Sequence, residues 1–249
     1  NFCTGNLRTM PQGTMLEKVP EIEKPAFIDY AFTSTGIYAF VTNHQKSTIT
    51  RLFYGNKLTN TPTAVDLGNY NGKIPDHTQG IQIVDENGNW YCFVAGGQKD
   101  NSKIVRLSFG NNIENKPQID EFFFDGKLDY PTDLIIEKEN GQWYGFSVNY
   151  NTSKLVKISF GNSLANTPVA QVIGDDSNFK NPCGMSYLQE NGNDYLFVTN
   201  YNGNSVSRVS FGNSLSNTPS NSNFDSQGIL QYPFDITIIR DCEHLFGFV

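Results

Sequence analysis

Charge is scarce in this sequence, and no part of it is strongly basic. Only 17% of the 249 residues are Asp, Glu, Lys or Arg, and the formal net charge is −7. Nucleic acids and anionic membrane surfaces are bound through clustered Lys and Arg side chains. The absence of such a cluster excludes both from the expected partners.

Other common signatures are missing as well. No apolar run approaches the ~20 residues of a membrane-spanning helix, so we expect no membrane insertion. The four cysteines show no CxxC spacing, and the three histidines show no HExxH spacing. No GxSxG or phosphate-binding loop occurs. We therefore predict no metal, no cofactor and no catalytic residue of these kinds.

Segments of helical period are absent, and an internal repeat covers most of the chain. The string "SFGNSLANTP" at 159–168 returns as "SFGNSLSNTP" at 210–219, with weaker copies at 54–62 and 109–117. A second marker is the Phe of an "FVTN"-like stretch, which recurs after 53, 53, 51 and 51 residues at Phe40, Phe93, Phe146, Phe197 and Phe248. This period excludes the shorter leucine-rich repeats.

One complete unit can be read from 131 to 174. The stretches "TDLIIEK", "QWYGFSVN", "KLVKISF" and "VAQVIG" alternate with turn sequences, of which "ENG" is typical of a tight hairpin. Such strands and turns predict antiparallel β-structure. Four strands, here called A to D in chain order, in about 50 residues are the blade of a β-propeller.

Strand B predicts how the blades stack. One face of each B strand is bulky and aromatic, as at Tyr38 and Phe40, and the opposite face carries small residues such as Ala39, Cys92 and Gly145. Because side chains alternate between the faces of a strand, adjacent blades can pack large residues against small ones. We expect Cys92 to be a core residue.

The repeat predicts one all-β domain over residues 1–249, a five-bladed β-propeller of four-stranded antiparallel blades. The last segment gives only strands A and B of a fifth unit, and "TGNLRTMP" at 4–11 resembles the loop before a strand D. N- and C-terminal strands would then close one blade and remove the open sheet edges. The alternative is an excerpt of a propeller with six or more blades. The expected blades are approximately 25–75, 76–128, 129–179 and 180–230, with a closing blade of 231–249 plus 1–24.

The blade model sorts the loops by face. The D–A connections and B–C loops surround one mouth of the channel, whereas the A–B and C–D turns lie at the other end. The "GNSLxNTP" string is a C–D loop, so we interpret it as a structural turn. The candidate ligand-binding residues at the channel mouth are Asp133, Asp235, Tyr130, Tyr232, Asn149, Tyr150, Asn200 and Tyr201.

Asp133 and Asp235 stand out because the other blades carry Phe27, Gly80 and Gly184 in the same slot. They could bind a ligand or cation, or they could only bond backbone amides. A glycosidase would need two carboxyl groups ~5–9.5 Å apart with different pKa values, and the sequence does not fix that distance. The tyrosines and asparagines are typical of sugar-binding surfaces.

Two further groups invite interpretation. The basic residues of strand C are predicted to form a solvated or salt-bridged outer strand face, and they are Arg51, Arg106, Lys157 and Arg208. Cys3 and Cys242 fall on one side of the closing blade, and we hypothesise a disulfide between them that staples the ring.

The repeats "NGQWYGFSVNY", "KLVKISFGNSLANTPV" and "RVSFGNSLSNTP" resemble those of large secreted propeller proteins of Bacteroidota, which are often exported by the type IX secretion system and tied to the cell surface or to gliding. The resemblance covers nearly the whole chain, and it rests on a repeat signature without an active-site motif. It implies an extracellular or cell-surface location, no catalytic residue, and a place in a larger chain or assembly.

We therefore expect a non-enzymatic binding, adhesion or scaffold propeller with protein or cell-surface glycan partners. Two alternatives remain open. The first is a lectin-like, glycan-binding propeller. The second is a glycoside hydrolase with a funnel of carboxylates, in which loss of activity on changing Asp133 or Asp235 would be diagnostic.

Overall fold

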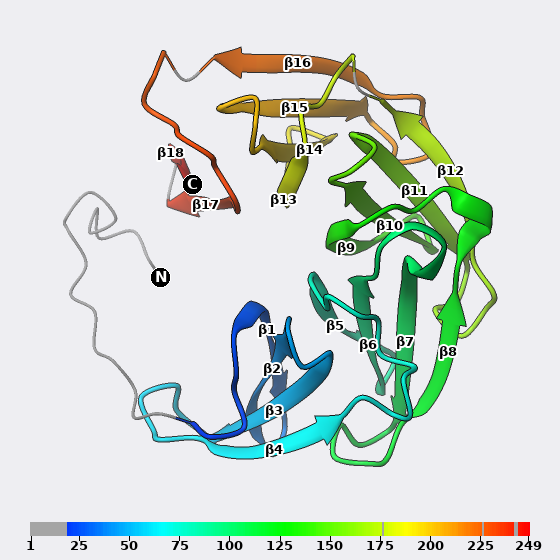
Figure 1. Cartoon of the computed structure of the whole chain (residues 1–249), viewed down its shortest axis with the longest axis vertical. Helices are drawn as coiled ribbons and strands as arrows, with labels where there is room; N and C mark the ends of the chain where they lie inside the picture. The colour runs from blue at the N-terminus through cyan, green and yellow to red at the C-terminus, as the bar shows by residue number, and fades with distance from the viewer. Residues whose placement is uncertain (1–18, 176, 226, 242–243) are drawn as a thin grey trace.

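The chain folds into an all-β propeller. The computed structural model describes residues 19–175, 177–225, 227–241 and 244–249. Four antiparallel four-stranded sheets stand around a common centre, each with its first strand innermost and its last strand outermost (Figure 1). The predicted class of fold is thus confirmed.

The strands of each sheet follow one another in chain order. The first blade is β1 (Pro25–Thr33), β2 (Gly36–Asn43), β3 (Thr48–Gly55) and β4 (Thr63–Gly68). The second is β5 (Ile81–Glu86), β6 (Asn89–Gly96), β7 (Lys103–Gly110) and β8 (Gln118–Phe122). The third is β9 (Pro131–Glu139), β10 (Gln142–Asn149), β11 (Lys154–Gly161) and β12 (Val169–Gly174). The fourth is β13 (Pro182–Glu190), β14 (Asn193–Asn200), β15 (Ser205–Gly212) and β16 (Ser220–Asp225).

The number of complete blades is four, not the five expected. A two-stranded sheet of β17 (Thr237–Asp241) and β18 (His244–Phe248) occupies the next position around the ring, between the fourth blade and the first (Figure 1). It supplies strands A and B of the expected fifth blade. Residues 1–18, to which most of its remainder was assigned, lie outside the described residues.

The turns follow the chemistry read from the sequence. Asn140 and Gly141 both have positive φ, 49° and 77°, as a type I′ hairpin requires, and the pairs 87–88 and 191–192 repeat this geometry. Gly161 begins the "GNSLANTP" loop with φ of 74°. Glycine adopts this left-handed backbone without steric cost, which explains its recurrence at the end of strand C.

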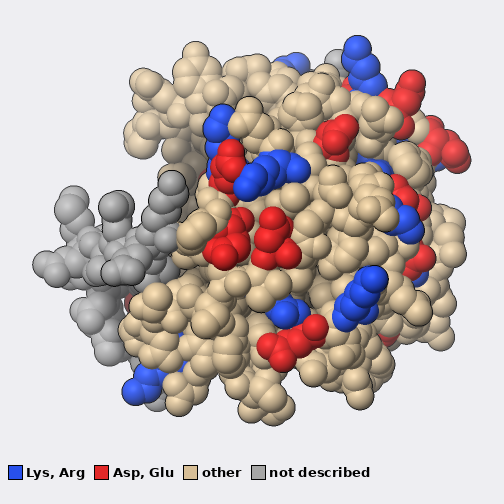
Figure 2. All heavy atoms as spheres, turned by 60° about the horizontal axis from the view of Figure 1, so that its bottom comes forward, with Lys and Arg blue, Asp and Glu red and all other residues tan. Residues whose placement is uncertain are grey.

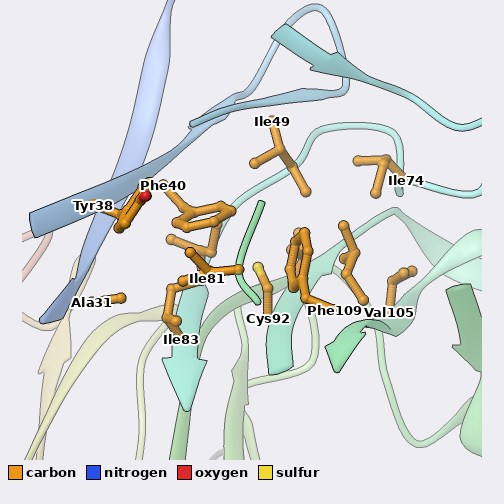
Figure 3. Close-up of a cluster of buried hydrophobic side chains, with 13 residues drawn as sticks. Ala31, Tyr38, Phe40, Ile49, Ile74, Ile81, Ile83, Cys92, Val105 and Phe109 are labelled. Atoms are coloured by element: carbon orange, nitrogen blue, oxygen red, sulfur yellow. The ribbon is translucent and has the colours of Figure 1, made fainter. Parts of the chain in front are cut away.

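The hydrophobic core lies between adjacent blades. Phe40 of β2 is fully buried and packs edge-on against Phe109 of β7, with ring centroids 5.7 Å apart. Figure 3 shows the same cluster, in which Tyr38 and Phe40 face Ile81 and Cys92 of the second blade. Equivalent Phe pairs at 5.2 Å join the second blade to the third and the third to the fourth. The predicted packing of bulky strand-B residues against a small residue of the next blade is seen at Cys92, which is buried in the core, and the Phe pairs add contacts between large residues.

The recurring string joins the third blade to the second and the fourth blade to the third. Ser163 Oγ and the Leu164 amide donate to the carboxylate of Glu86, which lies at the end of β5 in the preceding blade. Ser214 and Leu215 bind Glu139 at the end of β9 in the same way. The "GNSL" loop is therefore structural, as predicted, and its Ser and Leu make the contact between blades.

The basic residues of strand C have a role that the sequence did not indicate. Arg51 donates to the carbonyl of Ile113 at 2.9 Å, and Lys157 donates to that of Leu215 at 3.3 Å, each in the C–D loop of the following blade. Arg106 donates to the carbonyl of Asn166 at 2.8 Å as well as pairing with Asp120. The expectation of a merely solvated or salt-bridged face was thus incomplete, because the partners of these cations come from the next repeat.

The outer surface has no dominant charge on the side drawn in Figure 2. Acidic and basic side chains are interspersed there, and most of the surface carries neither. This agrees with the low charge content of the sequence. Among the described residues, no helix is both long and apolar enough to cross a membrane.

Candidate functional site: a central channel lined by carboxylates

The innermost strands enclose a cavity of about 270 Å³ at the centre of the ring. All five positions of the ring contribute to its wall, since β1, β5, β9, β13 and the segment leading into β17 line it. Four carboxylates face this cavity: Asp29, Asp133, Glu137 and Asp235. Strand pairing places them there because alternate residues of each inner strand point to the channel.

Asp133 links two blades through its carboxylate. Its Oδ1 accepts a hydrogen bond from the Leu134 amide at 2.7 Å, and its Oδ2 accepts one from the Met185 amide of the next blade at 2.6 Å. The residue is only 6% exposed. Both oxygens are therefore engaged, which is the backbone-bonding role that the sequence left open.

Asp29 repeats this arrangement in the first blade. Its oxygens accept from its neighbour Tyr30 at 2.8 Å and from Ile83 of the second blade at 2.7 Å. Gln82 continues the series, since its side chain bonds the backbone of Ile136 in the third blade. The inner strands are thus joined around the channel by polar side chains.

Asp235 differs from the other two aspartates. Its Oδ1 accepts from the Ile236 amide at 2.8 Å, and no described residue donates to its Oδ2. It is also exposed to the channel, whereas Asp133 is buried. Asp235 is consequently the aspartate with an oxygen free to meet a ligand.

The alternation of Gly and Asp in this slot has a packing reason. A Cβ on Gly184 would lie 2.5 Å from the Asp235 Oδ1, and one on Gly80 would lie 2.7 Å from the Asp133 Cα. The backbone at Asp133 and at Asp235 therefore approaches the preceding blade too closely for any residue but glycine to fit opposite it. The sequence showed the alternation, but the cross-blade contact behind it was not visible there.

The three aspartates differ in how readily they ionise. Burial raises the pKa of Asp133 well above its usual range, and the charges of Asp235 and Asp29 raise it further. Burial also raises the pKa of Asp29 and of Asp235, although backbone amides that donate to each carboxylate partly offset it. Asp133 is thus the carboxyl that retains its proton most readily.

Glu137 is a fourth carboxylate that the sequence analysis missed. It lies four residues after Asp133 on β9, which places it ~13 Å further along the channel. Burial, and then the nearby charge of Asp194, raise the pKa of Glu137 to about 7. The available signal was its place on the same strand face as Asp133, since Asp133, Ile135 and Glu137 alternate along β9.

The predicted mouth residues divide into two groups. Asn149 and Asn200 are buried and hold the D–A connections in place, which corrects the expectation that they meet a ligand. Asn149 Nδ2 donates to the Lys127 carbonyl at 2.8 Å, and Asn200 Oδ1 accepts from the Lys180 amide at 3.0 Å. These side chains are needed to close the loops over the blade ends.

The four tyrosines, in contrast, come together at the mouth. The ring centroids of Tyr130 and Tyr150 are 5.9 Å apart, those of Tyr150 and Tyr201 are 6.0 Å apart, and those of Tyr201 and Tyr232 are 5.1 Å apart. They come from the third, fourth and fifth positions of the ring. The sequence identified the members of this row but not their contact.

The hypothesis of a disulfide between Cys3 and Cys242 lies outside the described residues. Cys92 and Cys183 are free and buried. In the part of the chain that the structure describes, no three His, Cys, Asp or Glu side chains are grouped so that they could hold a metal ion.

Solved structures share this fold. No family model matches the sequence, and no curated protein matches it. A thermostable family-43 glycoside hydrolase is similar over 93% of this chain and 84% of its own, with a TM-score of 0.57 and 12% identity. An exo-1,5-α-L-arabinanase from a bovine ruminal metagenomic library is similar over 94% and 89%, with a TM-score of 0.54 and 13% identity. A mutant of AofleA from Arthrobotrys oligospora is similar over 90% and 64%, with a TM-score of 0.59 and 10% identity.

These comparisons overturn the expectation of a non-enzymatic adhesion or scaffold module. The glycoside hydrolases among the similar structures use the propeller as an enzyme, and the alternative of a glycosidase with a funnel of carboxylates agrees with them better. At 12–13% identity the likeness itself shows only the fold. The chemistry must be argued from the channel of this chain.

Proposed function

We propose that this propeller is a glycoside hydrolase that cleaves its substrate in the central channel beside Asp235. The observation that carries the proposal is the free Oδ2 of Asp235 in a cavity shared with two other, electrostatically interacting aspartates. Glycoside hydrolysis needs one carboxyl group that donates a proton and one carboxylate that stays charged.

The surroundings of Asp235 and Asp29 indicate which carboxyl group donates the proton and which stays charged. Asp235 has a raised pKa and an unengaged oxygen, so it can hold a proton and deliver it to the leaving oxygen of a glycoside. Asp29 lies at the adjacent ring position, and two backbone amides that donate to it offset part of the rise that burial gives its pKa, whereas Asp235 has only one such donor among the described residues. Asp29 then serves as the carboxylate that stabilises the developing positive charge, and it takes up the proton of the water that adds to the anomeric carbon as the glycosidic bond breaks. Asp133 positions this pair by tying the third blade to the fourth.

The test is turnover of a panel of aryl glycosides and neutral polysaccharides by the purified protein. Asp235→Asn is expected to lower kcat/KM by about 100-fold or more, because general acid catalysis contributes 10²–10⁴-fold. Asp85→Asn is the matched control, since Asp85 is an exposed aspartate in a hairpin at the far end of a blade. The proposal fails if no glycoside is turned over, or if Asp235→Asn retains full activity with an unchanged circular dichroism spectrum.

We also propose that the ring closes with a fifth blade completed by residues from 1–24. Arg208 supports this, because its buried Nε has no partner among the described residues, whereas its counterparts in the first three blades bind the next C–D loop. The first blade offers a second argument. Its face toward the fifth position carries an apolar groove of about 540 Å³, lined by residues that include Ile22, Phe27, Ile28 and Tyr30.

We further propose an extracellular location, from the resemblance of the repeats to secreted surface proteins. Polysaccharides accumulate outside cells, so this location suits the proposed activity. Fractionation of the source cells tests it, with the protein expected at the surface or in the medium. Recovery in the cytosolic fraction alone would contradict it.

A further inference from the structure

An unbroken row of aromatic rings crosses the mouth of the channel. It begins with His44 in the first blade and His77 in the second, whose ring centroids are 5.3 Å apart, and His77 is 6.2 Å from Tyr130. It continues through the tyrosine contacts of 5.9, 6.0 and 5.1 Å described above. The row spans all five positions of the ring: His44, His77, Tyr130, Tyr150, Tyr201 and Tyr232.

The backbone beneath this row is strained. At every ring position a residue on the approach to the innermost strand, the one before Pro25, Thr78, Pro131, Pro182 or Pro233, has a left-handed φ, with values of 49° at Lys24, 51° at His77, 54° at Tyr130, 50° at Asn181 and 49° at Tyr232. Asn tolerates this conformation better than an aromatic residue does. His77, Tyr130 and Tyr232 therefore carry a conformational cost at positions where Asn181 shows that a cheaper residue fits the same turn.

Packing does not explain the aromatic choice. Tyr232 is 61% exposed, His77 is exposed, and Tyr130, Tyr150 and Tyr201 are only partly buried. Exposed aromatic residues in a strained backbone are typical of binding sites, where the strain orients side chains for a ligand. The tyrosines of the row offer neutral rings and hydroxyls, whereas Lys24 and Asp76 lie beside its two histidines, so the tyrosine part of the row suits an uncharged ligand.

We propose that this aromatic row binds an extended, neutral polysaccharide and leads it across the mouth of the channel. This inference rests on the proposed function and adds its substrate class, a polymer rather than a small glycoside. Sugar rings present C–H faces that stack on aromatic rings, while the tyrosine hydroxyls of the row can bond sugar hydroxyls. The row extends over several ring contacts, which a single sugar could not fill.

The first experiment measures binding without catalysis. Affinity electrophoresis in gels containing arabinan, xylan, galactan or β-glucan is run with the Asp235→Asn protein, and retardation by at least one polymer is expected. Adding Tyr232→Asn should weaken that binding about tenfold, the effect of removing one stacking ring. The Asn replacement fits the left-handed backbone, so the free energy of unfolding should stay the same or rise. A purely structural Tyr232 would show the opposite, namely unchanged binding and lower stability.

A second variant pair addresses the centre of the row. Tyr150→Ala with Tyr201→Ala is expected to abolish retardation by the polymer, with an unchanged circular dichroism spectrum. Retained polymer binding by this variant, or no retardation of the parent protein by any of the four polymers, would overturn the inference. Binding that depends on the row in a protein that hydrolyses nothing would leave the inference standing and refute the proposed function.

Discussion

Glu86 joins two blades through more contacts than any other carboxylate described above. It is 7% exposed, and it accepts hydrogen bonds from the Trp143 indole at 2.6 Å, from Ser163 and from the Leu164 amide. Glu86→Ala would leave two buried donors of the third blade, the Trp143 indole and the Leu164 amide, and the partly buried Ser163 hydroxyl without their acceptor. We expect a loss of about 3 kcal/mol in the free energy of unfolding, measured by urea denaturation.

The matched control is Glu139→Ala. Glu139 holds Ser214 and Leu215 in the same way, but it is only half-buried and has no indole partner. A smaller loss is expected, about 1 kcal/mol. Equal losses of unfolding free energy in the two variants would show that the burial of Glu86 adds no stability to its contact between blades.

Glu137 gives the stability of the protein a pH dependence. Its folded pKa of about 7 lies above the ordinary value of 4.5, so the folded state binds the proton more tightly than the unfolded state does. The resulting stabilisation is complete below pH 4.5 and is lost as the pH rises to about 7, a change of about 3 kcal/mol at most.

Asp29, Asp133 and Asp235 also lower the stability of the folded protein as the pH rises, because each has a raised pKa. The measurement is therefore a comparison of Glu137→Gln with the parent protein by urea denaturation from pH 4.5 to 8. The variant should lose less stability across this window. Parallel curves for the two proteins would show that Glu137 titrates normally.

The aspartates also mark how far single residues can be predicted from the sequence. "YPTD" and "YPFD" place Asp133 and Asp235 in equivalent slots, and both do line the channel. Their different states depend on the next blade: Met185 donates to Asp133, whereas no described residue does so for the second oxygen of Asp235. Because the hydrogen-bond partner lies some 50 residues away in the chain, no local sequence pattern indicates it.

At the scale of the element, strand C is a connector as well as a strand. Arg106 is almost fully buried and binds both Asp120 of its own blade and the C–D loop of the third blade. Arg106→Ala should cost about 2–3 kcal/mol of stability and speed amide hydrogen exchange in the loop at 162–168.

Lys157→Ala is the companion variant for that experiment. Lys157 is half-buried, and its bonds to the carbonyls of Leu215 and Ser216 are both 3.3 Å long. Its loss should cost about 1 kcal/mol or less. Unchanged exchange in the loop of the Arg106 variant would contradict the role of strand C as a connector.

Strands and turns were the most predictable elements, because their signals are local. Asn140–Gly141 specifies its hairpin through backbone conformation alone, and the alternation in β2 follows from the geometry of a strand. The contacts of Arg106 and Glu86 could not be predicted, since each joins one repeat to the next. The position of a residue in the repeat predicts the strand or turn that it belongs to. Its contacts with the neighbouring blade become visible only in the folded structure.

At the scale of the whole molecule, closure of the ring can be tested by a double-mutant cycle. Deleting residues 1–18 should lower the free energy of unfolding by several kcal/mol if they complete the fifth blade, because a blade that packs against its neighbours buries apolar surface. Arg208→Ala should destabilise the full chain by about 1–2 kcal/mol and the deleted chain by much less.

Additive effects of the two changes would contradict closure through Arg208. An unchanged stability of the deleted chain would contradict the fifth blade as a whole. The repeat count predicted the propeller and the fifth ring position, whereas the extent of the last blade depends on segments at opposite ends of the chain, which a periodic pattern does not connect.

The hydrogen bonds that join adjacent blades also affect how the number of blades in such a ring can change. In each complete blade from the second onward, the C–D loop is hydrogen-bonded to the preceding blade. The second and third blades also carry the glutamate that accepts hydrogen bonds from the next loop, Glu86 and Glu139. A duplicated unit of this kind would bring both halves of the joint with it. Gene duplication could then insert a blade without any compensating substitution in these contacts, so the same residues that hold this ring together make its repeats interchangeable modules for evolution and for engineering.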